Sequence, residues 1–256
     1  MKKTWLITAV LITVALLMLA PFVAPQNEPL GTTAPLGTQL LSAIGESPIA
    51  WWPADGTAID IVNRADGVPQ NGSGYEKGVA GQAFAFNGVD QNVTVANGRA
   101  WNFGDHDFSI MLWAKSNAAG QPAPFISHDE GGGDMKKWIF WAGWTYGLVF
   151  HFNSPATGGF DVVACYSCSL TPGQWYHLAV TRKGPVYALY INGMPVARAT
   201  DGHVIPAANA PLQIGAAEGI YFDGSIDEVK VYQRALSAAE VRSFGFMQGA
   251  AAVTAP

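Results

Sequence analysis

The sequence predicts an all-β fold, a two-sheet antiparallel sandwich with one short C-terminal helix. Between Ile49 and Val231 the apolar residues recur at every second position in short bursts, the period of a half-buried strand. Gly, Asn, Asp and Pro separate these bursts, and 29 glycines and 16 prolines supply many tight turns. A helical period is almost absent over this stretch, so two packed sheets are the expected architecture.

The first 24 residues are expected to direct export across a membrane. A lysine pair precedes a charge-free, mainly apolar run from Trp5 to Ala20, as in an export signal. Proline follows each plausible cleavage residue, Ala20 and Ala24, so an uncleaved membrane anchor over residues 1–24 is an open alternative. In either case the rest of the chain is expected outside the cytoplasm, secreted or at the cell surface, with the membrane touched only through this segment.

The remainder is expected to hold one domain between two irregular segments. Residues 25–47 are rich in Pro, Gly, Thr and Ala without a strong period, which predicts a flexible linker. Residues 48–246 carry the strand pattern, and residues 247–256 are predicted to form a disordered tail. Oligomeric state is not indicated by any of these features.

The alternating pattern defines thirteen expected strands. In order they are Ile49–Trp52, Ala83–Phe86, Asn92–Val95, Phe108–Ala114, Phe125–His128, Trp138–Trp141, Tyr146–Phe152, Asp161–Cys165, Tyr176–Thr181, Val186–Ile191, Val196–Thr200, Leu212–Gly215 and Gly224–Tyr232. The sharpest turn is Asn192-Gly193, because both residues readily adopt positive φ in a two-residue hairpin. Pro195 lacks an N–H donor, which places the following strand at a sheet edge or at a bulge.

A short helix is expected after the last strand. Ser237 and Glu240 form a capping box, in which each side chain accepts a hydrogen bond from the other residue's N–H. Leu236 and Val241 occupy the apolar staple positions beside it. These residues predict one or two helical turns with a structural role.

Composition disfavours nucleic acid as a partner. The formal net charge is −5, the isoelectric point is near 5.4 and only 13% of the residues are charged. Phosphate backbones require a basic stripe, and the sequence has no larger basic cluster than Lys136-Lys137 and Arg182-Lys183.

Several segments resemble the laminin-G-like domains of the concanavalin A-like lectin/glucanase superfamily found in secreted bacterial proteins. They are Ile49–Gly56, Gly81–Asp90, Asn102–Lys115, Gly173–Arg182, Leu189–Gly193 and Phe222–Ser237, in the family's order and spacing. The resemblance runs from about Ile49 to Phe244 and implies a concanavalin A-like jelly roll. Residues 116–169 depart most from the family pattern, in the region of its variable loops.

Asp227-Glu228 is similar to the paired carboxylates of glycan hydrolases that share this sandwich. A retaining glycosidase requires an acid and a nucleophile about 5–5.5 Å apart. Ser225 stands where those enzymes carry a further glutamate. Adjacent strand residues normally point to opposite faces, so the pair is not expected to act on one substrate. We expect Asp227 to cap or ligate inside and Glu228 to be solvated.

The resemblance also implies a structural Ca²⁺ ion, because many such jelly rolls carry one. Calcium takes six to eight oxygen ligands from carboxylates, amides and carbonyls. The candidates by motif position are Asp60, Asn63, Asn87, Asp90 and Asp227. The same residue types also serve as ordinary turn residues, and both interpretations are open.

Cys165 and Cys168 are the only cysteines. In an exported chain a disulfide is the expected state, and it would close a very short loop at a strand end. A redox motif would need a helix N-terminus, and zinc would need two further ligands at suitable spacing.

The segment from Lys137 to Phe152 is unusually aromatic. Trp138 and Phe140 share one strand face, and Ile139 and Trp141 share the other, so one face is either covered or a platform for sugar rings. A Gly-rich acidic loop precedes it and offers hydrogen bonds to hydroxyls, or is simply solvated. The expected ligand contacts are Trp141, Trp144, Tyr146, His128, Asp129, Asp134 and His151.

The sequence therefore favours a non-catalytic carbohydrate-binding or adhesion module whose partner is a polysaccharide or glycoconjugate. A divergent glycoside hydrolase on the same fold is the first alternative, and a protein-interaction domain is the second. Catalytic residues are not assigned, because neither a nucleophile elbow nor a phosphate-binding loop is present in the sequence.

Overall fold

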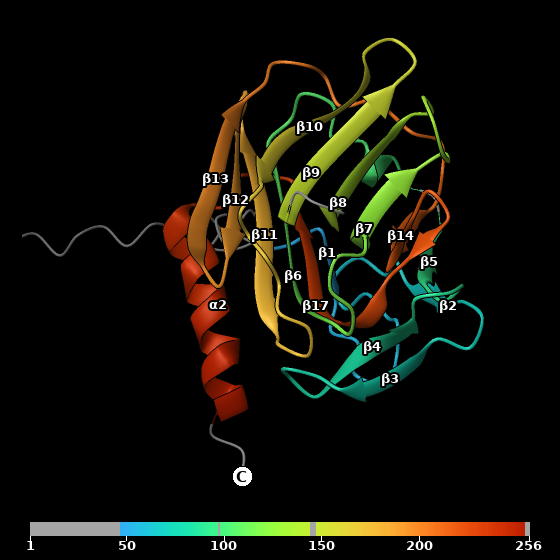
Figure 1. The fold of residues 1–256 in the computed structure, drawn as a ribbon, viewed down its shortest axis with the longest axis vertical. Coiled ribbons are helices and arrows are strands. Elements are labelled where there is room, and N and C mark those ends of the chain that lie inside the picture. The colour runs from blue at the N-terminus through green and yellow to red at the C-terminus, as the bar shows by residue number, and fades with distance from the viewer. Residues whose placement is uncertain (1–46, 97, 144–146, 254–256) are drawn as a thin grey trace, which may run out of the picture. The chain divides into compact units, whose positions relative to one another are not determined.

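The computed structural model describes residues 47–96, 98–143 and 147–253, and these form two large antiparallel sheets packed as a sandwich (Figure 1). Sheet A has the order β13-β12-β11-β6-β17-β4-β3, with β1 also paired to β17. Its strands are β1 (Ala50–Trp52), β3 (Gly74–Lys77), β4 (Gln82–Asn87), β6 (Phe108–Ser116), β11 (Tyr176–Lys183), β12 (Val186–Ile191), β13 (Met194–Thr200) and β17 (Asp223–Tyr232).

Sheet B has the order β10-β9-β8-β7-β14-β5-β2. Its strands are β2 (Gly67–Pro69), β5 (Val93–Val95), β7 (Ala123–Asp129), β8 (Lys137–Gly143), β9 (Gly147–Ser154), β10 (Gly158–Cys165) and β14 (Leu212–Ile214). A separate small hairpin joins β15 (Ala216–Ala217) to β16 (Ile220–Tyr221), and one 3₁₀ turn, η1, spans Arg99–Trp101. The expected all-β jelly-roll sandwich is confirmed, and each of the thirteen expected strands has a counterpart.

The core lies between the sheets and is built from alternate strand residues. On β6, Phe108, Ile110 and Leu112 point inward and are fully buried. Trp138 and Phe140 of β8 enter the same core from sheet B, and both are 0% exposed. The Trp138 Nε1 donates a hydrogen bond of 2.8 Å to the carbonyl of Trp101, so its one polar group is satisfied. One face of the aromatic segment is therefore core.

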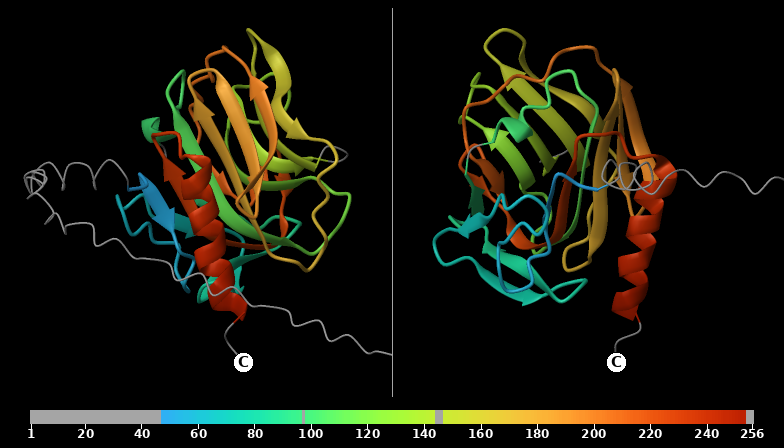
Figure 2. Two further views of the ribbon diagram at one scale, coloured as in Figure 1. Left: turned by 90° about the vertical axis from the view of Figure 1, so that its left-hand side faces the viewer. Right: turned by 180° about the vertical axis from the view of Figure 1, so that it is seen from behind.

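The outer face of sheet A is covered by α2 (Ala238–Val253), which lies against the sheet in the side views of Figure 2. The helix begins with the expected capping box: Ser237 N donates to Glu240 Oε2 at 2.7 Å, and Glu240 N donates to Ser237 Oγ at 3.3 Å. Leu236 and Val241 are buried in a second apolar cluster with residues of β6, β11, β12 and β17. This covering lets an antiparallel sheet bury residues on both faces.

The hairpin between β12 and β13 has the predicted geometry. Asn192 and Gly193 have φ values of 50° and 75°, as a turn of this type requires. β13 is the edge strand of sheet A, and the register of the pair shifts beside Pro195. Both of the features expected of Pro195 are therefore present.

Two sequence expectations differ from the structure. Strands β2, β3, β15 and β16 were not expected, because each is too short to show a clear alternation. The C-terminal helix is also longer than one or two turns: it continues to Val253, through most of the segment expected to be a disordered tail. The run Ala250-Ala251-Ala252 explains the extension, since alanine has the strongest intrinsic preference for helix.

The expected export segment, residues 1–24, and all of the expected linker, residues 25–47, except Ser47 lie outside the described residues. Within the described ranges no helix is long and apolar enough to cross a membrane. The secreted and anchored forms both stay predictions.

Cys165 and Cys168 form the expected disulfide, with Cα atoms 5.4 Å apart. Reduction should lower the free energy of unfolding by about 2 kcal/mol, because the bond closes a loop of only four residues in the unfolded chain. Urea unfolding with and without a reducing agent measures the difference. A Cys165→Ser/Cys168→Ser variant serves as the control and should not respond to the reductant. Equal unfolding curves for the oxidised and reduced chain would contradict this prediction.

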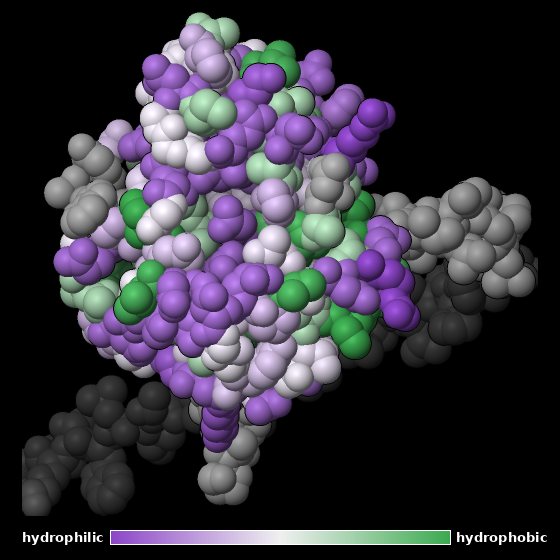
Figure 3. Space-filling view, turned by 90° about the vertical axis from the view of Figure 1, so that its right-hand side faces the viewer, coloured by the Kyte–Doolittle hydropathy of each residue, from purple (hydrophilic) through white to green (hydrophobic). Residues whose placement is uncertain are grey.

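The surface beside β2, β5 and β14 is largely hydrophilic, and Figure 3 shows its apolar side chains only in small separate groups. Exposed apolar residues do occur among the described residues, such as Ile61 in the segment after β1 and Val68 in β2. Scattered apolar residues of this kind are normal for a protein surface. The described residues of this face therefore form no broad apolar patch of the kind that marks protein docking.

Candidate functional site

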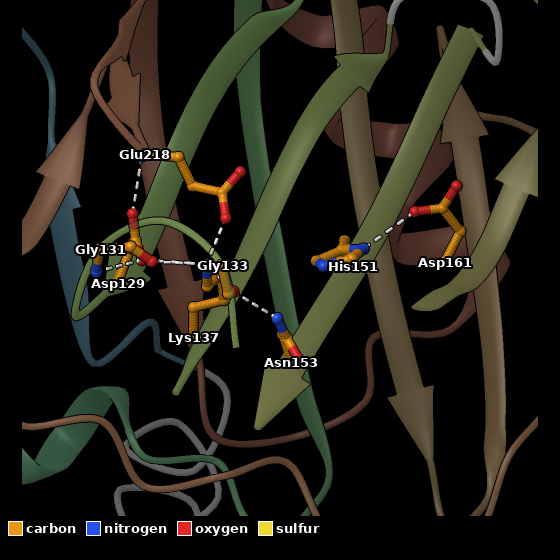
Figure 4. Close-up of polar contacts among 8 residues, drawn as sticks. All are labelled: Asp129, Gly131, Gly133, Lys137, His151, Asn153, Asp161 and Glu218. Atoms are coloured by element: carbon orange, nitrogen blue, oxygen red, sulfur yellow. Dashed lines mark hydrogen bonds and ion pairs between the residues drawn. The ribbon is translucent and has the colours of Figure 1, made fainter. Parts of the chain in front are cut away.

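Three side chains from neighbouring strands meet on the outer face of sheet B. Trp141 of β8 and His151 of β9 have ring centroids 6.3 Å apart. His151 lies directly opposite Asp161 of β10, and its Nδ1 is 3.0 Å from the Asp161 carboxylate (Figure 4). All three are partly exposed. We call Trp141, His151 and Asp161 the outer patch.

Strand register explains why these residues share a face. Directly opposed residues of an antiparallel pair point to the same side of the sheet. Trp141 is opposite Val149, and His151 is opposite both Ile139 and Asp161. Ile139 and Val149 are buried, at 1% and 0% exposure, yet they do not belong to the core cluster. They are buried apolar neighbours of His151 and Trp141 on the same face of the sheet.

The Trp141 side chain carries an unused donor. Its Nε1 is buried and has no hydrogen-bond partner in the part of the chain that the structure describes. A buried donor without a partner is uncommon, since most buried polar atoms are satisfied. The outer patch thus combines a partly exposed indole, a His–Asp pair and an unsatisfied N–H.

Beside the outer patch, Lys137 ties the Gly-rich loop to the sheet (Figure 4). Its Nζ donates to the carbonyls of Gly131 at 2.5 Å and Gly133 at 3.0 Å, and to the carboxylate of Glu218. The Asp129 carboxylate lies 3.8 Å from the same Nζ. Lys137 is 0% exposed, so all three of its donors are used inside the protein. We call these five residues the Lys137 cluster.

The Gly-rich loop therefore does bind a cation, but that cation is the chain's own ammonium group. Asp129 also accepts the N–H of Gly131 at 2.8 Å and the N–H of Glu218 at 2.7 Å. Asn153 adds a hydrogen bond of 2.6 Å to the carbonyl of Gly133. Both oxygens of Asp129 are occupied and the residue is 6% exposed, which contradicts its expected role as a ligand contact.

His128 is also corrected by its place in the fold. It points into the core, where its ring lies 6.3 Å from that of Trp138 and its Nε2 is 2.8 Å from the carbonyl of Ala210. The residue is 0% exposed, and burial lowers the pKa of its imidazole. A ligand at the surface therefore cannot contact His128.

The other expected contacts divide into two groups. Trp141 and His151 are brought together in the outer patch, whereas Asp134 is exposed in the loop that Lys137 ties down. Trp144 and Tyr146 lie outside the described residues, so they stay predictions. Asp161, Asn153, Lys137 and Glu218 were not expected. A lysine at the start of a strand normally signals a solvated end, and nothing in its neighbours reveals its burial.

The adjacency of Asp227 and Glu228 suggested that they point to opposite faces of the sheet. In the structure they do not. The register of β17 against β6 shifts between Asp227 and Lys230, and Glu228 has a φ of 54°. This is a β-bulge, which inserts one extra residue and resets the alternation. Ile226 and Val229 enter the core on either side of the pair, so both acids lie on the outer face of sheet A.

Both acids are nonetheless enclosed. Glu228 accepts hydrogen bonds from Lys230 Nζ at 2.6 Å and from Trp51 Nε1 at 3.0 Å, and it is 5% exposed rather than solvated. Asp227 is 0% exposed and accepts the N–H groups of Val79 and Ala80 at 2.8 and 3.1 Å. Burial raises the pKa of Asp227 to about 7. Neither carboxylate is accessible to a glycosidic bond.

The five expected calcium ligands do not fit one calcium site. The described residues contain no group of three or more His, Cys, Asp or Glu side chains able to share a metal, so Asp60, Asp90 and Asp227 are not gathered. Asp60 is used to accept four backbone N–H groups, those of Trp51, Val62, Asn63 and Ala65. Asn63 donates to the Ile49 carbonyl, and Asn87 donates to Asp90.

These residues act as turn-forming groups, the alternative that the sequence left open. The Asp60 carboxylate organises the loop after β1 in the way an Asx turn does, and Asn87 accepts the N–H groups of Val89 and Asp90. Calcium binding as such stays a prediction, without an assigned set of ligands.

With this geometry established, comparison with known proteins defines the family. The family model described as the concanavalin A-like lectin/glucanases superfamily matches residues 87–242 of the 256. The chain belongs to this superfamily. The matched range runs from the end of β4 into α2 and includes both the outer patch and the Lys137 cluster. A search of curated protein sequences found no significant match.

Solved structures show the same fold at low identity. Domain 4 of AbnA, a GH43 extracellular arabinanase from Geobacillus stearothermophilus in complex with arabinotriose, is 21% identical with a TM-score of 0.67, covering 78% of this chain and 98% of that one. The binding domain of Paraclostridial Mosquitocidal Protein 1 is 18% identical with a TM-score of 0.59, covering 77% of this chain. Trypanosoma rangeli sialidase is 18% identical with a TM-score of 0.57, covering 79% of this chain.

The matched lengths differ among these structures. This chain spans 52% of the length of the mosquitocidal binding domain and 33% of the length of the sialidase. Of the three structures named here, the arabinanase domain is the one matched over 98% of its own length. At these identities the comparisons establish the fold, and the activities belong to the proteins named.

Proposed function

We propose that this superfamily member is a non-catalytic carbohydrate-binding or adhesion module that works outside the cytoplasm. The observation that carries the proposal is the outer patch, where a partly exposed tryptophan stands beside a His–Asp pair. The arabinanase domain that matches over 98% of its length holds arabinotriose, which supports a glycan as the partner. Export rests on the N-terminal sequence alone.

The outer patch has the chemistry that saccharides require. Sugar rings place their C–H faces on flat aromatic rings, and binding sites add a few polar groups that fix orientation. When Nδ1 of His151 carries the proton and donates to Asp161, Nε2 is left as an acceptor for a sugar hydroxyl. Asp161 keeps a second carboxylate oxygen for a further hydroxyl.

The placement of the acids supports binding over cleavage. The one adjacent carboxylate pair that resembles a hydrolase site is buried, and Glu228 is engaged by Lys230 and Trp51. A glycosidase needs two accessible carboxyl groups that flank one bond. Near the outer patch, Asp129 is enclosed and Asp161 is paired with His151, which supports a site that holds a glycan without an acid–base pair.

Replacing Trp141 with Ala should weaken glycan binding at least about tenfold, equivalent to ~1.4 kcal/mol, because the stacking surface is lost. Binding of the full chain to a glycan array and to immobilised arabinan measures the effect. Trp175→Ala is the matched control, since Trp175 is also partly exposed but lies on the sheet A side under Lys115. Equal binding by the Trp141 and Trp175 variants would rule out the outer patch.

A further inference from the structure

A groove lined by residues other than those of the outer patch and the Lys137 cluster opens at one end of the sandwich. Two hollows of about 240 and 380 Å³ meet there and share the lining residues Ser116, Ala118, Gln121 and Ala123. One hollow reaches the disulfide loop, and the other reaches the β15–β16 hairpin and the turn after β4. We call this the rim groove. Small-molecule sites usually enclose about 300–1,000 Å³, and the rim groove is of that size.

Close backbone contacts hold the walls of the rim groove in place. A Cβ on Gly147 would meet the carbonyls of Cys165 and Cys168, so only glycine lets the disulfide loop pack against the start of β9. A Cβ on Gly88 would lie 2.7 Å from Cβ of Asp223, which joins the turn after β4 to the start of β17. Both glycines have positive φ, at 58° and 72°. The groove is therefore preformed.

The lining carries polar groups that no internal contact uses. Among the described residues, the side chains of Gln121, Ser167, Ser169 and Tyr221 form no hydrogen bond with the protein. They offer one amide and three hydroxyls, each able to donate and accept. Tyr166 lines the same groove and is 65% exposed. Two tyrosine rings and several free hydroxyl or amide groups are the components of a saccharide site.

The charge of the lining selects the class of saccharide. Asp223 is the one charged residue among the described lining residues of the two hollows, and its Oδ1 already accepts a hydrogen bond of 2.9 Å from Asn117. Arginine and lysine, the usual partners of carboxylate or phosphate groups, are absent from this described lining. A sialylated or phosphorylated glycan would find no counter-charge here and would be repelled by Asp223.

We propose that the rim groove is a second saccharide site, which holds a short neutral oligosaccharide. The proposal rests on the proposed function, because it assumes that the chain binds glycans, and it adds a location and a ligand class. The two sites adjoin along β8: Trp141 belongs to the outer patch, and the next residue, Ala142, lines the rim groove. A chain with two adjacent weak sites gains avidity on a polymer.

An NMR titration of the full chain with neutral arabinotriose tests the proposal. Arabinotriose should shift the amide signals of Gln121, Ser167 and Gly219, while 3′-sialyllactose should leave them unmoved. The variant Gln121→Ala/Tyr221→Ala should weaken arabinotriose binding at the rim about tenfold or more. Gln70→Ala, on the β2 side of the molecule, is the matched control, and thermal melting confirms that each variant folds.

The outcomes separate this proposal from the function itself. Shifts confined to the outer patch and abolished by Trp141→Ala, with the rim variant binding as wild type, overturn the rim groove and leave the proposed function intact. Equal shifts at the rim with 3′-sialyllactose overturn the neutral class. If neither arabinotriose nor 3′-sialyllactose shifts any amide signal, and no glycan on an array binds the chain, the proposed function fails. This proposal then fails with it.

Discussion

Replacing Lys137 with Met is expected to lower the free energy of unfolding by about 3 kcal/mol, since removing one partner of a buried ion pair strands the other. Nζ of Lys137 donates to Gly131, Gly133 and Glu218, and the lysine itself is 0% exposed. Without the ammonium, two carbonyls and the Glu218 carboxylate lose a hydrogen-bond donor, and Asp129 loses a nearby positive charge. Methionine keeps most of the volume, so the loss reflects charge and hydrogen bonds rather than a cavity.

Urea unfolding measures this loss, and hydrogen exchange reports where it arises. Amides of residues 130–136 should exchange faster in Lys137→Met, because the loop is no longer held to the sheet. Lys136→Met is the matched control, since Lys136 is exposed and adjacent in sequence. If both variants unfold at the same urea concentration, the Lys137 cluster does not stabilise the loop as we describe.

The second large effect is the pH dependence carried by Asp227. Burial raises the pKa of this carboxyl from 3.8 to about 7 in the folded chain. The folded chain thus binds the proton more tightly than the unfolded chain does. The stabilisation that the Asp227 carboxyl contributes is fully present below about pH 4 and is lost as the pH rises through about 7. A shift of this size corresponds to ~4 kcal/mol.

The variant Asp227→Asn isolates that contribution. Asparagine keeps an oxygen for the N–H groups of Val79 and Ala80 but carries no charge. Relative to wild type, the variant should therefore gain about 4 kcal/mol in unfolding free energy between pH 4 and pH 8. Burial lowers the pKa of His177 to about 4, an opposite effect that is common to both proteins and cancels in the comparison. A difference between variant and wild type that stays constant with pH would contradict the prediction.

The fold could be predicted from the sequence because the patterns that indicate it involve residues close together in the chain. Alternation along strands such as Phe108–Ser116, the Asn192-Gly193 turn and the Ser237–Glu240 capping box each depend on residues close in the chain. Two-residue and three-residue strands such as β15 and β2 carry too few positions for a period to appear. β15 pairs with the equally short β16, and β2 pairs with the three-residue β5.

The candidate site could be predicted only in part, because its main features depend on residues far apart in the sequence. The bulge at Glu228 places Asp227 and Glu228 on one face, and no residue in β17 signals it, since the bulged position is not glycine. Lys137 is buried where its ammonium meets the Gly-rich loop and Glu218, which lies between β15 and β16, far away in the sequence. Both are tertiary effects that override the local pattern.

The aromatic segment shows both outcomes in one strand. Strand alternation correctly paired Trp138 with Phe140 and Ile139 with Trp141, and the first pair became core. The second pair lies on the outer face of sheet B, with Ile139 buried and Trp141 partly exposed. Alternation divides a strand into two faces, but only the sheet order decides which face meets the other sheet.

The most direct test of the central claim measures binding and cleavage in the same samples. The full chain is incubated with arabinotriose and with glycans bound on an array, and both the dissociation constants and the release of new reducing ends are recorded. We predict binding without new reducing ends, weakened at least about tenfold in Trp141→Ala. Release of reducing ends by the wild-type chain, or no binding to any glycan, would contradict the claim that this superfamily member binds carbohydrate without cleaving it.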